Sequence, residues 1–250
     1  MPKIAIIAAL EREICPLVKH WQSSEREHAG RKSRFFENQD CVAVCGGIGA
    51  EPARRATEAV IALFQPQIVY SVGFAGALDA RLAVGEIVVP ACIVDARDCS
   101  RIETARGEGV LVSFGSVATP EQKKKLAESF GACAVDMEAA FVARAAEARG
   151  VRFAAVKAIS DDSSFRLPTM DAFIAADGQF RDWKFAAYTI VRPWLWAKAV
   201  HLARNSMRAA DVLCSWLASN LQKTDDTASE NSEMARARSF APPEERLRSG

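Results

Sequence analysis

The chain has 250 residues, half of them apolar and a quarter charged, and its 32 Lys and Arg residues nearly balance its 31 Asp and Glu residues. This is an ordinary globular composition, and the lack of a basic excess argues against nucleic-acid binding. No apolar stretch approaches the roughly 18 residues that a membrane-spanning helix needs. The length allows one large α/β domain or two small ones.

Cysteine and histidine usage bears on the compartment and on metal binding. The cysteines are Cys15, Cys41, Cys45, Cys92, Cys99, Cys133 and Cys214, and the histidines are His20, His28 and His201. An odd number of cysteines without CxxC spacing favours reduced thiols in a cytoplasmic protein over disulfides or a zinc site. The scattered histidines weaken a metal site further, so neither metal nor cofactor is expected.

The C-terminal end differs from the rest of the chain. From about Thr224 to Gly250, acidic side chains and four arginines come with little that could form a core. This composition predicts a disordered tail over 223–250 and one domain over 1–222.

Short β-branched apolar runs alternate with helical patterns along that domain. Strands are expected over Ile4–Ala9, Cys41–Cys45, Ile68–Val72, Glu86–Val94 and Phe153–Ile159, and helices over Ala9–Lys19, Glu51–Phe64 and Met137–Ala148. The alternation predicts an α/β fold with three αβα layers around a central mixed, largely parallel sheet. Ligand sites in such folds lie at the carboxyl ends of the strands.

Two glycine-rich turns follow predicted strands, Gly46–Gly49 and Gly73–Gly76. The first opens onto a helix whose N-terminal amides could hold an anion or a sugar hydroxyl. Neither turn matches the GxGxxG fingerprint or a P-loop. Taken alone, each is an ordinary tight turn that needs glycine for positive φ.

Acidic residues gather at three predicted strand ends. They are Glu11 and Glu13, Asp136 and Glu138, and Asp161 and Asp162. A single acid at a helix start is usually a cap or a partner of the helix dipole. Three such clusters at strand ends fit cleavage of a glycosidic bond, where one acid protonates the leaving group and another activates the nucleophile.

Five motifs between about Lys3 and Asp162 occur in an order that resembles a known family. They are Ile6–Ile14, Cys45–Gly49, Ser71–Gly76 with Val84–Val88, Ala134–Ala140 and Val156–Asp161. The set resembles the purine nucleoside phosphorylase and methylthioadenosine/S-adenosylhomocysteine nucleosidase superfamily, with VDMEAA and AISD as its specific parts. The resemblance implies a nucleoside phosphorylase-like fold, a small-molecule nucleoside substrate and a homodimer.

The resemblance also implies roles for single residues. Asp161 would protonate or hydrogen-bond N7 of the purine, with Asp162 as its rival in the sequence. Glu13 would activate water, with Glu11 as the alternative if the register shifts by two. The other residues expected around the substrate are Glu138 at the ribose hydroxyls, Met137 against the ribose, Asp136, Gly73, Phe74, Ala75, Lys157 and Ser160, and Val117 and Ala118 against the base.

Departures from the family pattern concern the nucleophile. Phosphorylases of this superfamily clasp phosphate with an arginine and a serine near the Gly73 turn, where this chain has Ser71 and Phe74. Arg12 or Lys157 could substitute, but without an arginine in the turn an anion loses a bidentate partner. Hydrolysis of a 5′-modified adenine nucleoside of the methylthioadenosine or S-adenosylhomocysteine type is therefore expected. Phosphorolysis and non-catalytic nucleoside binding stay as alternatives.

Aromatic residues concentrate near the end of the domain, with four of the five tryptophans between Trp183 and Trp216. Trp196, Val200, Ala203, Met207, Ala210, Leu213 and Leu217 share one face of a predicted basic amphipathic helix. That face either packs on the core or a second subunit, or lets residues 183–217 touch a membrane surface or a lipid-like substrate. With a lipid-like substrate, the chain would resemble a hopanoid-associated branch of the superfamily, which acts on adenosylhopane.

Overall fold

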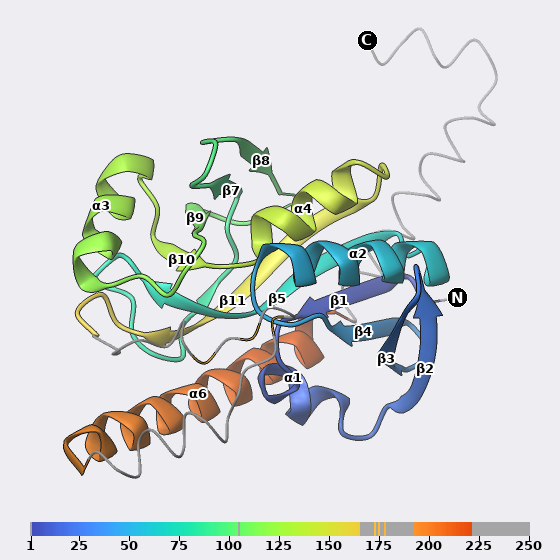
Figure 1. Ribbon diagram of the computed structural model, residues 1–250, viewed down its shortest axis with the longest axis horizontal. Coiled ribbons are helices and arrows are strands. Elements are labelled where there is room, and N and C mark those ends of the chain that lie inside the picture. The colour runs from blue at the N-terminus through green and yellow to red at the C-terminus, as the bar shows by residue number, and fades with distance from the viewer. Residues whose placement is uncertain are drawn as a thin grey trace, which may run out of the picture.

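The computed structural model describes residues 2–104, 106–165, 173, 175, 178 and 193–221. The predicted tail at 223–250 and the aromatic residues at 183–192 lie outside these. The described chain forms a central mixed sheet with helices on both faces (Figure 1). The expected three-layer α/β architecture is confirmed.

The centre of the sheet is parallel. β1 (Ile4–Ala8) lies between β4 (Cys41–Cys45) and β5 (Ile68–Ala77), and β5 also pairs with β11 (Arg152–Asp161). These strands are almost entirely buried because helices cover both of their faces. The predicted turn at Gly46–Gly49 follows β4, but Gly73–Gly76, also predicted as a turn, lies inside β5 and pairs with β11, so that prediction is wrong.

Antiparallel strands extend the sheet on both sides. A hairpin of β2 (Gln22–His28) and β3 (Arg31–Glu37) adds to β4. On the other side, the order from β5 is β10 (Ala134–Asp136), β9 (Val110–Ser113), β7 (Cys92–Asp95) and β8 (Arg101–Glu103). The sequence analysis did not predict the β2–β3 hairpin, because β2 and the first half of β3 are polar and largely exposed.

The strand predicted over Glu86–Val94 is wrong as one element. It is divided into β6 (Ile87–Val88), which pairs with β11, and β7, which pairs with β8 and β9. Pro90 lies in the break, where its missing N–H costs no ladder hydrogen bond. An unpredicted helix, α3 (Pro120–Phe130), follows β9 and is capped by the Thr119 side chain.

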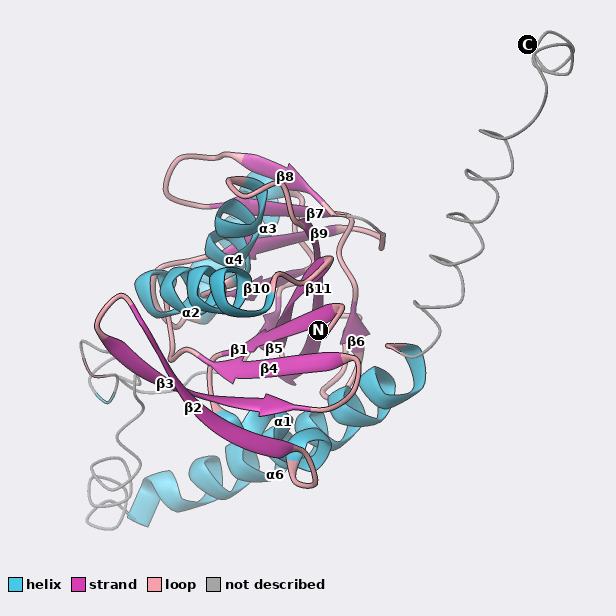
Figure 2. Cartoon of the chain, turned by 90° about the vertical axis from the view of Figure 1, so that its right-hand side faces the viewer, coloured by secondary structure: helices cyan, strands magenta, loops and turns pink. Residues whose placement is uncertain are grey.

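The remaining helices form the two outer layers, seen edge-on in Figure 2. α2 (Ala50–Phe64) and α4 (Ala139–Glu147) pack on one face, and α1 (Glu11–Val18) and α6 (Pro193–Asn220) on the other. The predicted helices therefore exist, with ends shifted by one or two residues.

The amphipathic face of α6 divides into two parts. Leu213 and Leu217 in its second half are fully buried against the sheet, as the core-packing prediction required. Nearer the start of the helix, Trp196, Val200 and Met207 are 53%, 51% and 61% exposed, so this part of the face does not pack on the core, and packing on a second subunit stays a prediction. Within the described residues, no helix has the length and apolarity needed to cross a membrane.

Candidate active site

A cavity of about 180 Å³ opens at the carboxyl ends of β5, β10 and β11. Most of the substrate-site residues expected from the sequence line it. They are Glu13, Phe74, Ala75, Val117, Ala118, Asp136, Met137, Glu138, Ser160 and Asp161. Leu10, Ile48 and, from α6, Leu202 and Ser206 line it too, although the sequence analysis did not place them there. We call this space the nucleoside cavity.

Glu13 is held in place by the start of α1. Its Oε2 accepts hydrogen bonds from the backbone N–H groups of Ala9 (3.0 Å) and Leu10 (3.2 Å). Burial raises the pKa of the Glu13 carboxyl above its ordinary value, against the opposing effect of these bonds and of Lys157. A carboxylate with a raised pKa is a stronger base, as activation of water requires.

Gly73 lies behind Glu13 and does not line the cavity. A Cβ built on Gly73 would come within 2.9 Å of Glu13 Oε2, and its φ of +150° also disfavours a side chain. The glycine expected at the substrate therefore makes room for the carboxylate of Glu13.

Lys157 likewise lies behind the cavity wall, almost fully buried. Its Nζ is 2.9 Å from Asp136 Oδ2 and donates to Ser71 Oγ at 3.1 Å. Burial alone would lower the pKa of Lys157, but the Asp136 and Glu138 carboxylates outweigh it and raise that pKa. Lys157 therefore balances the charge of the buried acids, whereas the sequence analysis expected it at the substrate.

Glu138 lies at the cavity wall between two loops. Its Oε1 accepts a hydrogen bond from the Gly49 N–H at 2.8 Å, and its Oε2 one from the Met137 N–H at 3.3 Å. Burial and the neighbouring Asp136 carboxylate raise the pKa of Glu138 to about 8. The glycine turn expected to bind an anion or a hydroxyl thus orients a carboxylate that faces the cavity.

The titration of Glu138 makes stability depend on pH. In the unfolded chain its pKa is near the ordinary value of 4.5, so between pH 4.5 and 8 only the native state keeps the proton. Native stability therefore falls as pH rises through this window. For Glu138→Gln we expect the melting temperature, relative to the wild type, to increase from pH 5 to 8 and then level off, measured by calorimetry. Glu128→Gln, on the exposed face of α3, is the matched control, and equal profiles for all three proteins would contradict the assignment.

Asp161 ends β11 and points into the cavity. Its Oδ1 accepts a hydrogen bond from Ser160 Oγ at 2.7 Å, and its Oδ2 forms an ion pair with the Lys123 ammonium. Lys123 also donates to the Asp162 carbonyl oxygen at 2.6 Å. The Asp162 carboxylate instead accepts from the N–H and hydroxyl of Ser164, so of the two rivals only Asp161 faces the cavity.

Of Glu11 and Glu13, the two candidates for activating water, only Glu13 faces the nucleoside cavity. The Glu11 carboxylate lies 3.6 Å from the Arg34 guanidinium, and Glu11 does not line the nucleoside cavity. Glu13, two residues on, faces inward because residues two apart on a helix point to nearly opposite sides.

Lys123 is the main site residue that the sequence analysis missed. Its side chain is 3% exposed, and it comes from α3, whose only other buried residue is Leu126. The available signal was a lysine three residues before a buried leucine, on the same helix face. Its partner Asp161 is 38 residues away, so no local pattern connects the two.

The fold and the cavity together define a class of protein. It has three αβα layers and a cavity, lined by four acidic residues, where strands of the mixed sheet end. The chain belongs to the phosphorylase superfamily, whose family model matches residues 3–107 and 101–179.

Sequence relatives lie within this superfamily. One, a 5′-methylthioadenosine/S-adenosylhomocysteine nucleosidase of Marinomonas sp., is 32% identical over 93 residues, 36% of this chain and 40% of that protein. The match thus spans less than half of that relative's length. A nucleosidase of the same name from Shewanella halifaxensis is 26% identical over 215 residues, 70% of this chain and 94% of that protein.

The same fold occurs in solved structures. Futalosine hydrolase of Helicobacter pylori superposes with a TM-score of 0.67 at 20% identity, over 89% of this chain and 98% of that one. At this identity the likeness concerns the fold alone.

Proposed function

We propose that the protein hydrolyses the N-glycosidic bond of a 5′-substituted adenosine and releases adenine. The observation that carries the proposal is the placement of Glu13, Glu138 and Asp161 around one cavity. The names of the sequence relatives support adenine nucleosides of the methylthioadenosine and S-adenosylhomocysteine type.

Each carboxyl group has a separate task in this reaction. Asp161 takes a proton from the Lys123 ammonium paired with it and passes it to N7 as the C1′–N9 bond breaks, so that adenine leaves as a neutral base. Glu138 accepts hydrogen bonds from the ribose hydroxyls. Glu13 takes a proton from the water whose oxygen attacks C1′, and the positive charge that develops on the sugar is stabilised between these carboxyl groups.

Water is favoured over phosphate as the nucleophile. Lys157, one candidate for holding phosphate, is bound to Asp136 and Ser71 behind the cavity wall. The other candidate, Arg12, does line the cavity. It is the one guanidinium among the described lining residues, so no second arginine helps it to hold phosphate. Phe74, in β5, packs partly into the apolar layer beneath α6, so this position offers phosphate no polar side chain.

A panel of nucleosides tests the proposal. Methylthioadenosine, S-adenosylhomocysteine, adenosine and inosine are incubated with the protein, with and without phosphate, and free base is followed. We expect adenine release from the 5′-substituted compounds without phosphate. A requirement for phosphate would establish the phosphorylase alternative, and binding without turnover the non-catalytic one.

We further propose that the first half of α6 contacts a lipid surface, which would also suit the hopanoid-associated alternative. Val200 and Met207 are exposed on one side of α6, beside the exposed Trp196, and Arg204 and Arg208 are exposed on the same half of the helix. An apolar stripe flanked by cations is typical of helices that lie on anionic membranes.

Co-sedimentation with vesicles that contain phosphatidylserine tests the contact. Met207→Ser is expected to lower the bound fraction severalfold, whereas Val212→Ser, on the opposite side of α6, leaves it unchanged. Equal binding of both variants would contradict the proposal. The homodimer expected from the family stays a prediction.

A further inference from the structure

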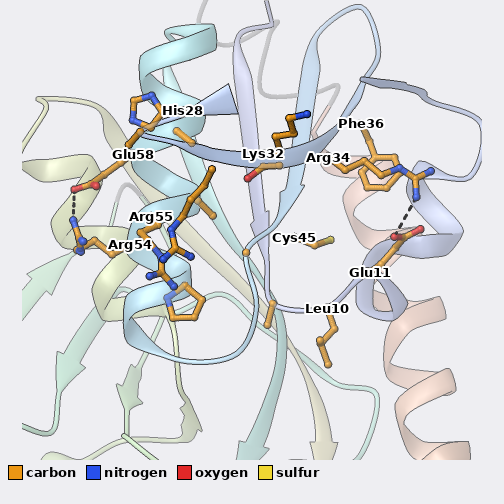
Figure 3. A pocket seen from close by; sticks show the side chains of 18 residues that line it. Leu10, Glu11, His28, Lys32, Arg34, Phe36, Cys45, Arg54, Arg55 and Glu58 are labelled. Carbon is orange, nitrogen blue, oxygen red and sulfur yellow. Dashed lines mark hydrogen bonds and ion pairs between the residues drawn. The ribbon is translucent and has the colours of Figure 1, made fainter. Parts of the chain in front are cut away.

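A second and larger cavity, of about 690 Å³, is shown in Figure 3. The tip of the β2–β3 hairpin forms one wall, and the first turns of α2 form the other. Leu10, which follows β1, lines both cavities, so the two adjoin at this residue. We call this second space the basic cavity.

Its charged lining is strongly unbalanced. The cations are Arg31, Lys32, Arg34, Arg54 and Arg55, and the anions are Glu11 and Glu58. Figure 3 shows Arg54 and Arg55 on one side of the cavity and Arg34 on the other. An excess of cations in a concave, partly desolvated space attracts anions.

On the α2 side, the carboxylates of Glu51 and Glu58 are shared with guanidinium groups from outside the helix, Arg31 and Arg149. Arg54 lies 2.7 Å from both Glu51 and Glu58, and Arg55 is 3.7 Å from the same Glu51 carboxylate. Arg31, from the hairpin, also acts electrostatically on Glu51, so one carboxylate serves three guanidinium groups. An incoming carboxylate or phosphate would complete this arrangement.

The positive charge on the hairpin side of the basic cavity is also little neutralised by carboxylates. Arg34 stacks on the Phe36 ring at 4.7 Å and reaches Glu11 only at 3.6 Å. Lys32 and Arg31 form no ion pair in the described part of the chain. Two cationic side chains of the hairpin are therefore available to a ligand.

Cys45 lies near charged groups of both cavities. Its thiol lines the basic cavity, and burial, followed by the carboxylates of Glu13 and Glu11, raises its pKa, while Arg34 lowers it. Cys45 therefore lies between acidic groups and a cation at the edge of the basic cavity.

We propose that the basic cavity binds an anionic group, a carboxylate or a phosphate, at the far end of the 5′ substituent of the nucleoside substrate. This inference rests on the proposed function and narrows its substrate class. The apolar Leu10 would contact the middle of the substituent, and the guanidinium groups of Arg31 and Arg55 would bind its end, since their planar donors match a carboxylate or a phosphate.

Three 5′-thioadenosines test this directly. The first carries a methyl group, the second a short alkyl chain ending in a carboxylate, and the third the same chain ending in a carboxamide. For the wild type we expect kcat/KM for the carboxylate to exceed that for the carboxamide by about tenfold or more, since hydrogen bonds to charged groups are about twice as strong as neutral ones. Arg55→Gln and Arg31→Gln should bring the ratio close to one, and Arg81→Gln, an exposed arginine outside both cavities, should preserve it.

Each other outcome is informative. A wild-type ratio near one, or a preference for the methyl compound over the carboxylate, would overturn the proposal. Inorganic phosphate tests a free anion as the occupant: an effect on cleavage of the methyl compound that disappears in Arg55→Gln would assign the cavity to that anion instead. If the methyl compound is not cleaved at all, the proposed function fails, and dissociation constants of the same three compounds then test the subsite by itself.

Discussion

Asp161→Asn should lower kcat for adenine release by about 10²–10⁴-fold, the usual contribution of a positioned acid. An amide is nearly the same size as a carboxyl group, and it can still accept the hydrogen bond from Ser160. It cannot pass a proton to N7, so adenine would have to leave as an anion. Single-turnover assays that follow free adenine measure the loss separately from substrate binding.

Asp162→Asn is the matched control, because it makes the same chemical change one residue away, outside the cavity. Its kcat should stay close to that of the wild type. A second control addresses folding, since Asp161→Asn removes the charge partner of the buried Lys123 ammonium. In the double variant with Lys123→Met no ammonium is left unpaired, so an unchanged melting temperature together with lost activity assigns the loss to chemistry. Full activity of Asp161→Asn would refute the proposed mechanism.

Glu13→Gln is expected to reduce kcat by a similar factor, about 10²–10⁴, because the site loses its base for water. Both backbone N–H groups that hold Glu13 donate to one oxygen, Oε2, and the amide oxygen of glutamine can replace it. The side chain should therefore keep its place. Since burial already disfavours the charged form of Glu13, the variant should be at least as stable as the wild type.

Glu11→Gln, two residues earlier, serves as its control and should keep nearly full activity. The pH profile of kcat/KM gives an independent readout, because the acid limb that reflects Glu13 should vanish in Glu13→Gln and persist in Glu11→Gln. If Glu11→Gln loses activity and Glu13→Gln keeps it, the assignment of the two residues is reversed.

The centre of the fold follows from local sequence. β1, β4, β5 and β11 were predictable because strands covered on both faces are continuous apolar runs. The β2–β3 hairpin was not, because its polar residues match no apolar period and the hairpin is stabilised by pairing with β4. Pro90 divided a predicted strand whose two halves pair with different neighbours, which the apolar pattern could not show.

By itself, the sequence determined the α/β class, the superfamily and the three acidic clusters, since these depend on residue types at short, ordered spacings. Tertiary structure alone decided that Glu13 rather than Glu11, and Asp161 rather than Asp162, faces the cavity, because neighbouring side chains on a helix or a strand point to different sides. It also decided that Lys123 joins Asp161, that Lys157 lies behind the wall, and that half of an apolar helix face stays exposed. Each of these depends on contacts between residues far apart in the chain, and no local pattern records them.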